Sequence, residues 1–181
     1  MKRNFIQARS LTKLALIAAL TAAGVVSSSG ASAAAATATA SGTVVSPIAI
    51  AVATNLAFGS FAPGAGGTVT VDTGGTRAAS GPILMGAGAS SAARFNITGQ
   101  AGLTYSIVHS GTTVLSNGAN TMALTKFSDL AGVNGTSGTA TTGTLDGAGA
   151  QSLFVGGTLT VAANQVAGVY TGTVIATVEY N

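Results

Sequence analysis

The last stretch of the chain, residues 167–181, alternates between apolar and polar side chains. From Tyr170 onward the even positions are mostly apolar and the odd positions mostly polar. Successive side chains of a β-strand point to opposite faces, so this period of two predicts a strand with one buried face. The strand would end with the chain, and no later segment would pair along its free edge. We therefore expect an open assembly edge or groove that contains Tyr170, Val174, Ala176, Val178 and Tyr180.

Short alternating segments of the same kind recur through the rest of the chain. They include residues 48–52, 68–72, 94–98, 104–109 and 122–127, and glycine-rich turns separate them. No segment after residue 33 sustains the apolar repeat of three to four residues that an amphipathic helix needs. The pattern predicts a single all-β antiparallel sandwich. A β-helix is the alternative, but the sequence shows no fixed repeat period.

The alternation also predicts particular contacts. Residues 94–98 and 104–109 are expected to form a hairpin, and Gly156-Gly157 is expected to form a two-residue turn or a glycine bulge. Residues 128–149 hold little to bury and are expected to form a long exposed loop. The expected core consists of Ile48, Ile50, Phe58, Phe95, Ile97, Tyr105, Ile107, Leu159, Val161, Tyr170, Val174 and Val178.

The beginning of the chain has the pattern of a secretory signal peptide. Basic residues come first, an apolar run covers residues 14–26, and Ala31-Ser32-Ala33 follows as a cleavage site. A membrane anchor is the competing interpretation, but the apolar run falls short of the roughly 20 residues that cross a bilayer. The expected organisation is a signal peptide (1–33), an N-terminal extension (34–45) and one domain (46–181). Export through the inner membrane, to the periplasm or the cell surface, would follow.

Cleavage would change the charge of the protein. Three basic residues (Arg77, Arg94, Lys126) and four acidic ones (Asp72, Asp129, Asp146, Glu179) would remain, which gives a net charge of −1. A nearly neutral surface has no basic stripe that could neutralise phosphates or attract an anionic membrane. We therefore expect no nucleic-acid partner and no membrane insertion after cleavage. Charged residues make up 6% of the chain, which suits a protein packed against neighbours.

The sequence offers few groups for catalysis or metal binding. His109 is the single histidine, no serine lies in a G-x-S-x-G motif, and the four carboxylates are far apart. Cysteine is absent, so neither a disulfide framework nor a Cys/His metal cluster is expected. His109 is expected to be a strand residue that faces solvent or a hydrogen-bonded neighbour. We predict a protein that is not an enzyme, with no catalytic, cofactor-binding or metal-binding residues.

The extension at residues 34–45 consists almost entirely of small residues. Its even positions, Ala36, Ala38, Ala40, Gly42 and Val44, would share one face of an extended strand. These residues are candidates for a donor strand that enters the groove of another copy. Two alternatives remain open: the segment is a flexible tail, or it folds back onto its own domain.

Several stretches together resemble a known family. They are NLAFG at residues 55–59, Phe95 to Gly99 with Tyr105, LFVGGTL at residues 153–159 and AGVYTG at residues 167–172. In this order they resemble the secreted bacterial domain-of-unknown-function family 4402, over essentially the whole chain after residue 33. More distantly, residues 56–59 and the C-terminal strand look like spore coat protein U and the pilins of archaic chaperone–usher systems.

The pilin resemblance implies an immunoglobulin-like sandwich that lacks its last strand. It also implies that the N-terminal extension of each subunit fills the groove of the next. The implied partners are copies of the chain itself or related subunits, together with a periplasmic chaperone and an outer-membrane usher. The chain departs from such pilins at Pro47 and in having no cysteine, where they usually carry half of a disulfide.

Two functions from different classes follow from these observations. The first is a secreted structural or adhesive surface protein, a pilin-like subunit that assembles by strand addition. The alternative is a soluble extracellular or periplasmic binding module, for example for surface polysaccharide, with residues 73–81 and 128–149 as its ligand surface. Those loops lack the aromatic and charged side chains that usually anchor sugars, so the structural role ranks first.

Overall fold

The computed structural model describes residues 33–86 and 89–181. The chain divides into two units, residues 1–42 and residues 43–181. The described part of the first unit, residues 33–42, is exposed and has no regular secondary structure. The predicted signal peptide lies outside the described residues, apart from Ala33.

The second unit is built from strands, and no helix occurs among the described residues. Its strands are β1 (Ala49–Thr54), β2 (Phe61–Ala62), β3 (Gly67–Val71), β4 (Arg77–Ser80), β5 (Ile83–Leu84), β6 (Ala93–Thr98), β7 (Thr104–Gly111), β8 (Val114–Asn117), β9 (Asn120–Asp129), β10 (Thr142–Thr144), β11 (Ala150–Val161) and β12 (Val174–Tyr180). All of their pairings are antiparallel. The predicted all-β antiparallel sandwich is confirmed.

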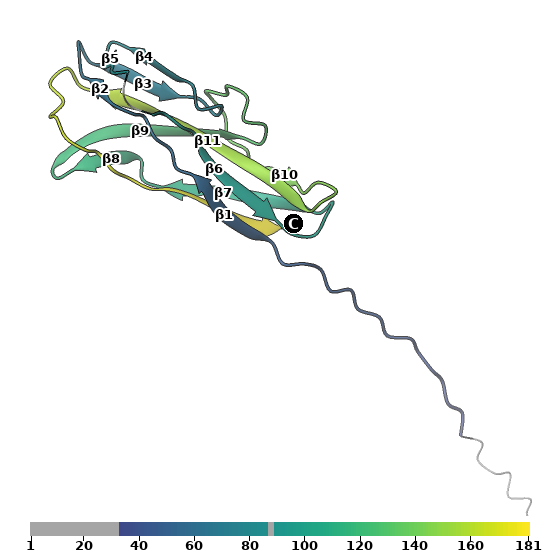
Figure 1. Ribbon diagram of the computed structural model, residues 1–181. Coiled ribbons are helices and arrows are strands. Elements are labelled where there is room, and N and C mark those ends of the chain that lie inside the picture. Colours follow the sequence, from purple (N-terminus) through teal and green to yellow (C-terminus); the bar gives the residue numbers. More distant parts are fainter. Residues whose placement is uncertain (1–32, 87–88) are drawn as a thin grey trace, which may run out of the picture. The chain divides into compact units, whose positions relative to one another are not determined.

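A large and a small sheet form the two layers of the sandwich (Figure 1). The large sheet has the order β1-β6-β11-β3-β4, and β9 and β8 continue it from the other side of β11. The small sheet has the order β10-β7-β12. A separate pair, β2 and β5, lies at one end. The long strand β11 is central because β6, β3 and β9 all pair with it.

The core lies between the two sheets. Side chains at alternate positions of β6 and β11 meet those of β7 and β12, as the period of two requires. Phe95, Ile97 and Leu153 from the large sheet pack with Tyr105, Ile107 and Val178 from the small one. A second cluster includes Phe58, Val69, Met122, Leu124 and Leu159.

Most of the expected core residues are buried. Four of them, Ile48, Ile50, Tyr170 and Val174, are half-buried instead. They lie in or beside β1 and β12, and these strands are at the edges of their sheets. An edge position leaves part of the inward-facing side chain uncovered, which accounts for the difference.

The predicted hairpin of residues 94–98 and 104–109 is wrong. These residues form β6 and β7, but β6 pairs with β1 and β11 and β7 pairs with β10 and β12. The turn between them therefore crosses from one sheet to the other. Their inward faces, with Phe95 and Ile97 on one and Tyr105 and Ile107 on the other, meet across the core.

Gly156-Gly157 is not a turn, because β11 runs straight through it. The register with β9 continues without a shift across both glycines, so there is no bulge on that side. The partner on the other side changes here, from β6 to β3. A Cβ at Gly156 would collide with the ring of Phe127, and one at Gly157 would lie 2.9 Å from the Leu124 side chain. The glycines make room for these neighbours.

Candidate functional site

One side of the sandwich is closed by backbone pairing. Ser128 N–H donates to Gly138 O (3.1 Å), and Ala140 N–H donates to Ser128 O (3.2 Å), which joins the end of β9 to the segment before β10. That segment then continues into β10, which pairs with β7. The backbone is thus continuous from the large sheet to the small sheet. Residues 128–149 are therefore not simply a loop.

His109 belongs to this closed side. It follows Tyr105 and Ile107 on the inward face of β7 and is half-buried. Its Nε2 lies 2.9 Å from Ala140 O and 3.1 Å from Ser128 Oγ. The hydrogen-bonded neighbour that the sequence predicted is therefore present.

The other side of the sandwich has two strand edges that face each other without a ladder between them. β1 and β12 each pair with one strand among the described residues, β6 and β7 respectively. Thr112 N–H donates to Thr173 O (2.9 Å), and Asn181 N–H donates to Thr104 O (3.2 Å). Odd residues of β12 therefore turn their backbone groups toward β7. In an antiparallel ladder the even residues then turn theirs toward the free edge.

The two edges approach each other at one end. The Tyr180 hydroxyl donates to Ser46 O (2.8 Å) and accepts a hydrogen bond from Gln100 N–H (2.6 Å). This contact joins the end of β12 to the residues just before β1. We call it the Ser46 end of the domain.

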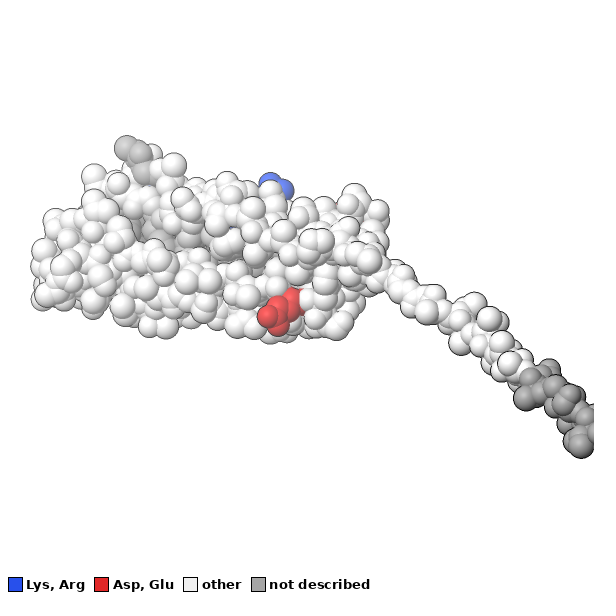
Figure 2. Space-filling view, turned by 90° about the horizontal axis from the view of Figure 1, so that it is seen from below, with Lys and Arg blue, Asp and Glu red and all other residues white. Residues whose placement is uncertain are grey.

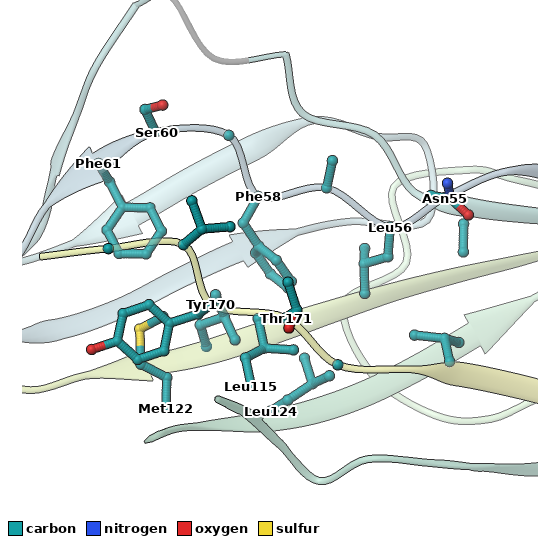
Figure 3. A pocket seen from close by; sticks show the side chains of 18 of the residues that line it. Asn55, Leu56, Phe58, Ser60, Phe61, Leu115, Met122, Leu124, Tyr170 and Thr171 are labelled. Atoms are coloured by element: carbon teal, nitrogen blue, oxygen red, sulfur yellow. The ribbon is translucent and has the colours of Figure 1, made fainter. Parts of the chain in front are cut away.

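Away from the Ser46 end, the edges separate and enclose a groove of about 960 Å³. One wall consists of residues 52–63, and the other consists of residues 165–174. The floor is apolar and is formed by Ala93, Phe95, Leu115, Met122, Leu124 and Leu159. Figure 3 shows Phe58 pointing into the groove toward Leu115 and Leu124, and the ring of Tyr170 beside Met122. None of the lining residues is charged.

The first wall is held from its outer side. Ala57 exchanges two backbone hydrogen bonds with Ser91 (2.9 and 3.0 Å), and Phe61 and Ala62 pair with β5. Ser91 Oγ also donates to Asn55 O (2.8 Å). Phe58 belongs to the second core cluster, and the side chains of Leu56 and Phe61 pack against it. This wall presents mainly apolar side chains to the groove.

The second wall presents backbone groups to the groove. Thr171 exchanges two backbone hydrogen bonds with Ser116 of β8 (2.9 and 3.0 Å), on the side away from the first wall. By the same alternation as in β12, the N–H and C=O groups of Tyr170, Gly172 and Val174 face the groove. The Tyr170 hydroxyl donates to Val166 O (2.8 Å) and accepts a hydrogen bond from Gln165 Nε2 (2.7 Å). These two bonds hold residues 165–170 of the wall together.

Apolar side chains are exposed along the rim. The exposed fraction is 61% for Val52, 52% for Val166 and 80% for Val169, and all three line the groove. Single exposed valines are ordinary, but three beside one uncharged groove form a patch. Such a patch is typical of a surface that binds an apolar partner.

The predicted assembly residues are divided by the structure. Tyr170 and Val174 line the groove, whereas Ala176, Val178 and Tyr180 lie farther along β12, toward the Ser46 end. Val178 is in the core, and Tyr180 makes the contact with Ser46. The predicted donor residues Ala36, Ala38, Ala40, Gly42 and Val44 are exposed and belong to no strand.

Sequence reasoning placed Phe58, Phe95 and Leu159 in the core, but it did not predict that the first wall and the floor form a groove. The first wall includes the motif NLAFG at residues 55–59, whose Phe58 belongs to the expected core but not to the expected assembly residues. Its apolar residues Leu56 and Phe58 stand two apart just after β1, and that was a signal for a continued strand-like segment. The floor residues come from β6, β8, β9 and β11, and no local pattern shows that these strands meet.

Other parts of the described structure offer less. A second, more open cavity of about 490 Å³ lies over β6 and the start of β11, beside Arg94, Asn96 and Gln151. No three His, Asp or Glu side chains among the described residues are close enough to share a metal ion. Figure 2 shows a face almost without charged side chains.

No helix in the described part of the chain has the length and apolar character needed to cross a membrane. Burial raises the pKa of the Tyr105 hydroxyl and lowers the pKa of the Lys126 ammonium group.

Comparison with known families gives one match. The model of a domain of unknown function, DUF4402, matches residues 48–180, which include both walls and the floor of the groove. The chain belongs to this family. The match begins just before β1 and ends at the last residue of β12, so the family domain coincides with the sandwich. No curated protein and no solved structure shows significant similarity to the chain.

Proposed function

We propose that the protein is a non-enzymatic structural or adhesive subunit of an exported assembly, joined by strand addition at the groove. The observation that carries the proposal is the open side of the sandwich. There, the backbone groups of Tyr170, Gly172 and Val174 face an apolar groove that no described segment fills. A row of unpaired backbone donors and acceptors beside an apolar floor is what an extended segment binds.

The occupant that fits best is the N-terminal extension, residues 34–45, of a second copy. Large side chains such as Met122, Leu124 and Phe95 already fill the floor and are themselves almost fully buried. A strand that lies over this floor has little depth to fill, so alanine and glycine suit it better than large side chains do. Ala side chains bury little area, so backbone hydrogen bonds would supply most of the specificity.

The position of Ser46 favours exchange between copies over closure within one copy. Ser46 is held by Tyr180 and Gln100 at the end of the domain where β1 and β12 approach each other. The groove lies beyond this contact, between residues 52–63 and 165–174. To reach its own groove, the extension would have to reverse direction at Ser46 and pass between two edges that are already in contact. The groove of a neighbour imposes no such reversal.

Partners and location follow from the same proposal. The resemblance to spore coat protein U and archaic chaperone–usher pilins supports a homopolymer or a polymer with related subunits. A periplasmic chaperone that covers the groove before assembly and an outer-membrane usher belong to the same proposal. Export rests on the signal-peptide pattern of residues 1–33.

Deletion of residues 34–45 tests the proposal. The purified wild-type chain is expected to form oligomers or filaments by light scattering and electron microscopy, and the deletion variant is expected to stay monomeric. A synthetic peptide of residues 34–45 should then bind the deletion variant. A scrambled peptide of the same composition is the control. A wild-type chain that stays monomeric with an ordered extension would refute exchange between copies.

A further inference from the structure

Arg77 binds three main-chain carbonyl groups on the outer side of the first wall. Its Nη1 donates to Phe58 O (2.8 Å) and Ser60 O (3.1 Å), and its Nη2 donates to Met85 O (3.0 Å). Arg77 begins β4, which pairs with β3 in the large sheet. The rigid guanidinium fork thus ties the wall to a fixed part of the sandwich.

The backbone of residues 57–62 makes its hydrogen bonds to other described segments on the side away from the groove. Every hydrogen bond from the backbone of residues 57–62 to another described segment goes to Ser91, Arg77, Met85 or β5. The Ser60 side chain also points away from the groove in Figure 3. The carbonyl groups of Phe58 and Ser60 are therefore occupied, and an incoming strand would have to pair with the opposite wall.

Two apolar side chains of this wall, Leu56 and Phe61, are half-buried and keep part of their surface exposed. Val166 and Val169 are exposed on the other wall of the groove. Movement of the wall toward them would bury apolar surface and close the groove. Two bonds between Ala57 and Ser91 and the short β2–β5 pair hold the two ends of the wall. Arg77 holds the part between them, together with the Met85 N–H that donates to Ser60 O (3.1 Å).

We propose that Arg77 is the positioning residue of the groove. By binding the carbonyl groups of Phe58, Ser60 and Met85, it keeps the first wall apart from the second, so that the groove stays open for an added strand. The added strand then pairs with Tyr170, Gly172 and Val174 on one side and meets apolar side chains on the other. The expected effect on assembly rests on the proposed function, but the effect of Arg77 on the first wall can be measured without it.

The test compares Arg77→Gln and Arg77→Lys with Arg94→Gln in the full chain. Arg94 is a control, because it pairs with Thr54 only through the backbone, while its side chain binds Ser152 Oγ and lies over the Phe154 ring and holds no carbonyl group of the first wall. In Arg77→Gln, amide hydrogen exchange of residues 54–63 should rise by about tenfold or more, while that of β6 and β11 stays unchanged. Arg77→Lys keeps the charge but not the fork, so an intermediate rise is expected. Arg94→Gln should leave residues 54–63 unchanged.

Assembly is the second measurement. Light scattering should show that Arg77→Gln assembles several times more slowly than the wild-type chain. Urea unfolding should give the same free energy of unfolding for the two proteins. If exchange rises equally in all strands, or does not rise in residues 54–63, Arg77 is not a positioning residue. If the wild-type chain does not assemble at all, the proposed function fails, and the exchange experiment still decides the role of Arg77.

Discussion

Tyr105 carries a polar group that the core does not satisfy. Its side chain is completely buried, and its hydroxyl has no hydrogen-bond partner among the described residues. Gly143 of β10 lies directly opposite in the ladder, and a Cβ there would collide with the tyrosine hydroxyl. The glycine therefore makes room for the ring. Tyr180 is the opposite case, because its hydroxyl both donates and accepts a hydrogen bond.

The two tyrosines should respond differently to the same substitution. Tyr105→Phe removes an unsatisfied buried hydroxyl and should raise the free energy of unfolding by about 1 kcal/mol. Tyr180→Phe removes a satisfied hydroxyl and should lower it by about 1 kcal/mol. Urea unfolding followed by circular dichroism measures both changes. A loss of stability in Tyr105→Phe would show that the hydroxyl has a partner.

The raised pKa of Tyr105 also predicts a pH dependence. Below the ordinary tyrosine pKa of 10.0 the hydroxyl is neutral in the folded and the unfolded chain. Above it the unfolded chain ionises first, so stability falls as the pH rises. Tyr105→Phe should reduce this fall. The lowered pKa of Lys126 acts in the opposite direction and is present in both proteins. An identical alkaline fall in the two proteins would contradict the assignment to Tyr105.

At the scale of single elements, residues 34–45 offer a test with an internal control. In a donor strand the even positions would face the floor of the groove and the odd positions would face solvent. Ala40→Arg should abolish assembly, because a buried unpaired charge costs several kcal/mol. Thr39→Arg should leave it intact. Sedimentation of both variants beside wild type measures the difference, and equal effects at the two positions would exclude a strand with one buried face.

Elements whose own side chains decide their position could be predicted from the sequence. In β6 and β12 the alternation gave both the strand and its buried face, because each has one covered side. The position of Gly156-Gly157 inside a strand could not be predicted in this way. Its glycines are needed because Phe127 and Leu124 approach from another strand, and no local pattern contains that fact. The predicted hairpin between β6 and β7 was wrong for a similar reason, because a crossing between sheets and a hairpin use the same turn residues.

The candidate site was predictable only in part. Tyr170 and Val174 belong to an alternating segment, so the sequence predicted them as assembly residues. The first wall depends on Ser91, Arg77 and Met85, which lie outside it in the sequence and hold it in place. A groove is the space between such segments, so it follows from their tertiary arrangement rather than from either segment alone.

At the scale of the whole molecule, the position of Ser46 relative to the groove predicts a polarity for the assembly. The extension is attached at Ser46, so the end of the donor near Val44 must stay close to the subunit that supplies it. The acceptor groove is blocked toward its own Ser46 end by the contact with Tyr180. The donor would therefore enter from the opposite end, with Ala36 deepest and Val44 near the rim. Residues 36–44 would run antiparallel to residues 166–174, and these two segments have the same length.

Disulfide trapping between two differently substituted chains tests strand exchange between copies. The natural chain has no cysteine, so each introduced thiol is unique. A chain with Ala36→Cys mixed with a chain with Val174→Cys should give a covalent dimer, as should Val44→Cys mixed with Val166→Cys, because antiparallel pairing brings each pair to disulfide distance. Dimers from Val44→Cys with Val174→Cys, in place of the expected pairs, would contradict the polarity. The absence of every one of these dimers would contradict strand exchange between copies.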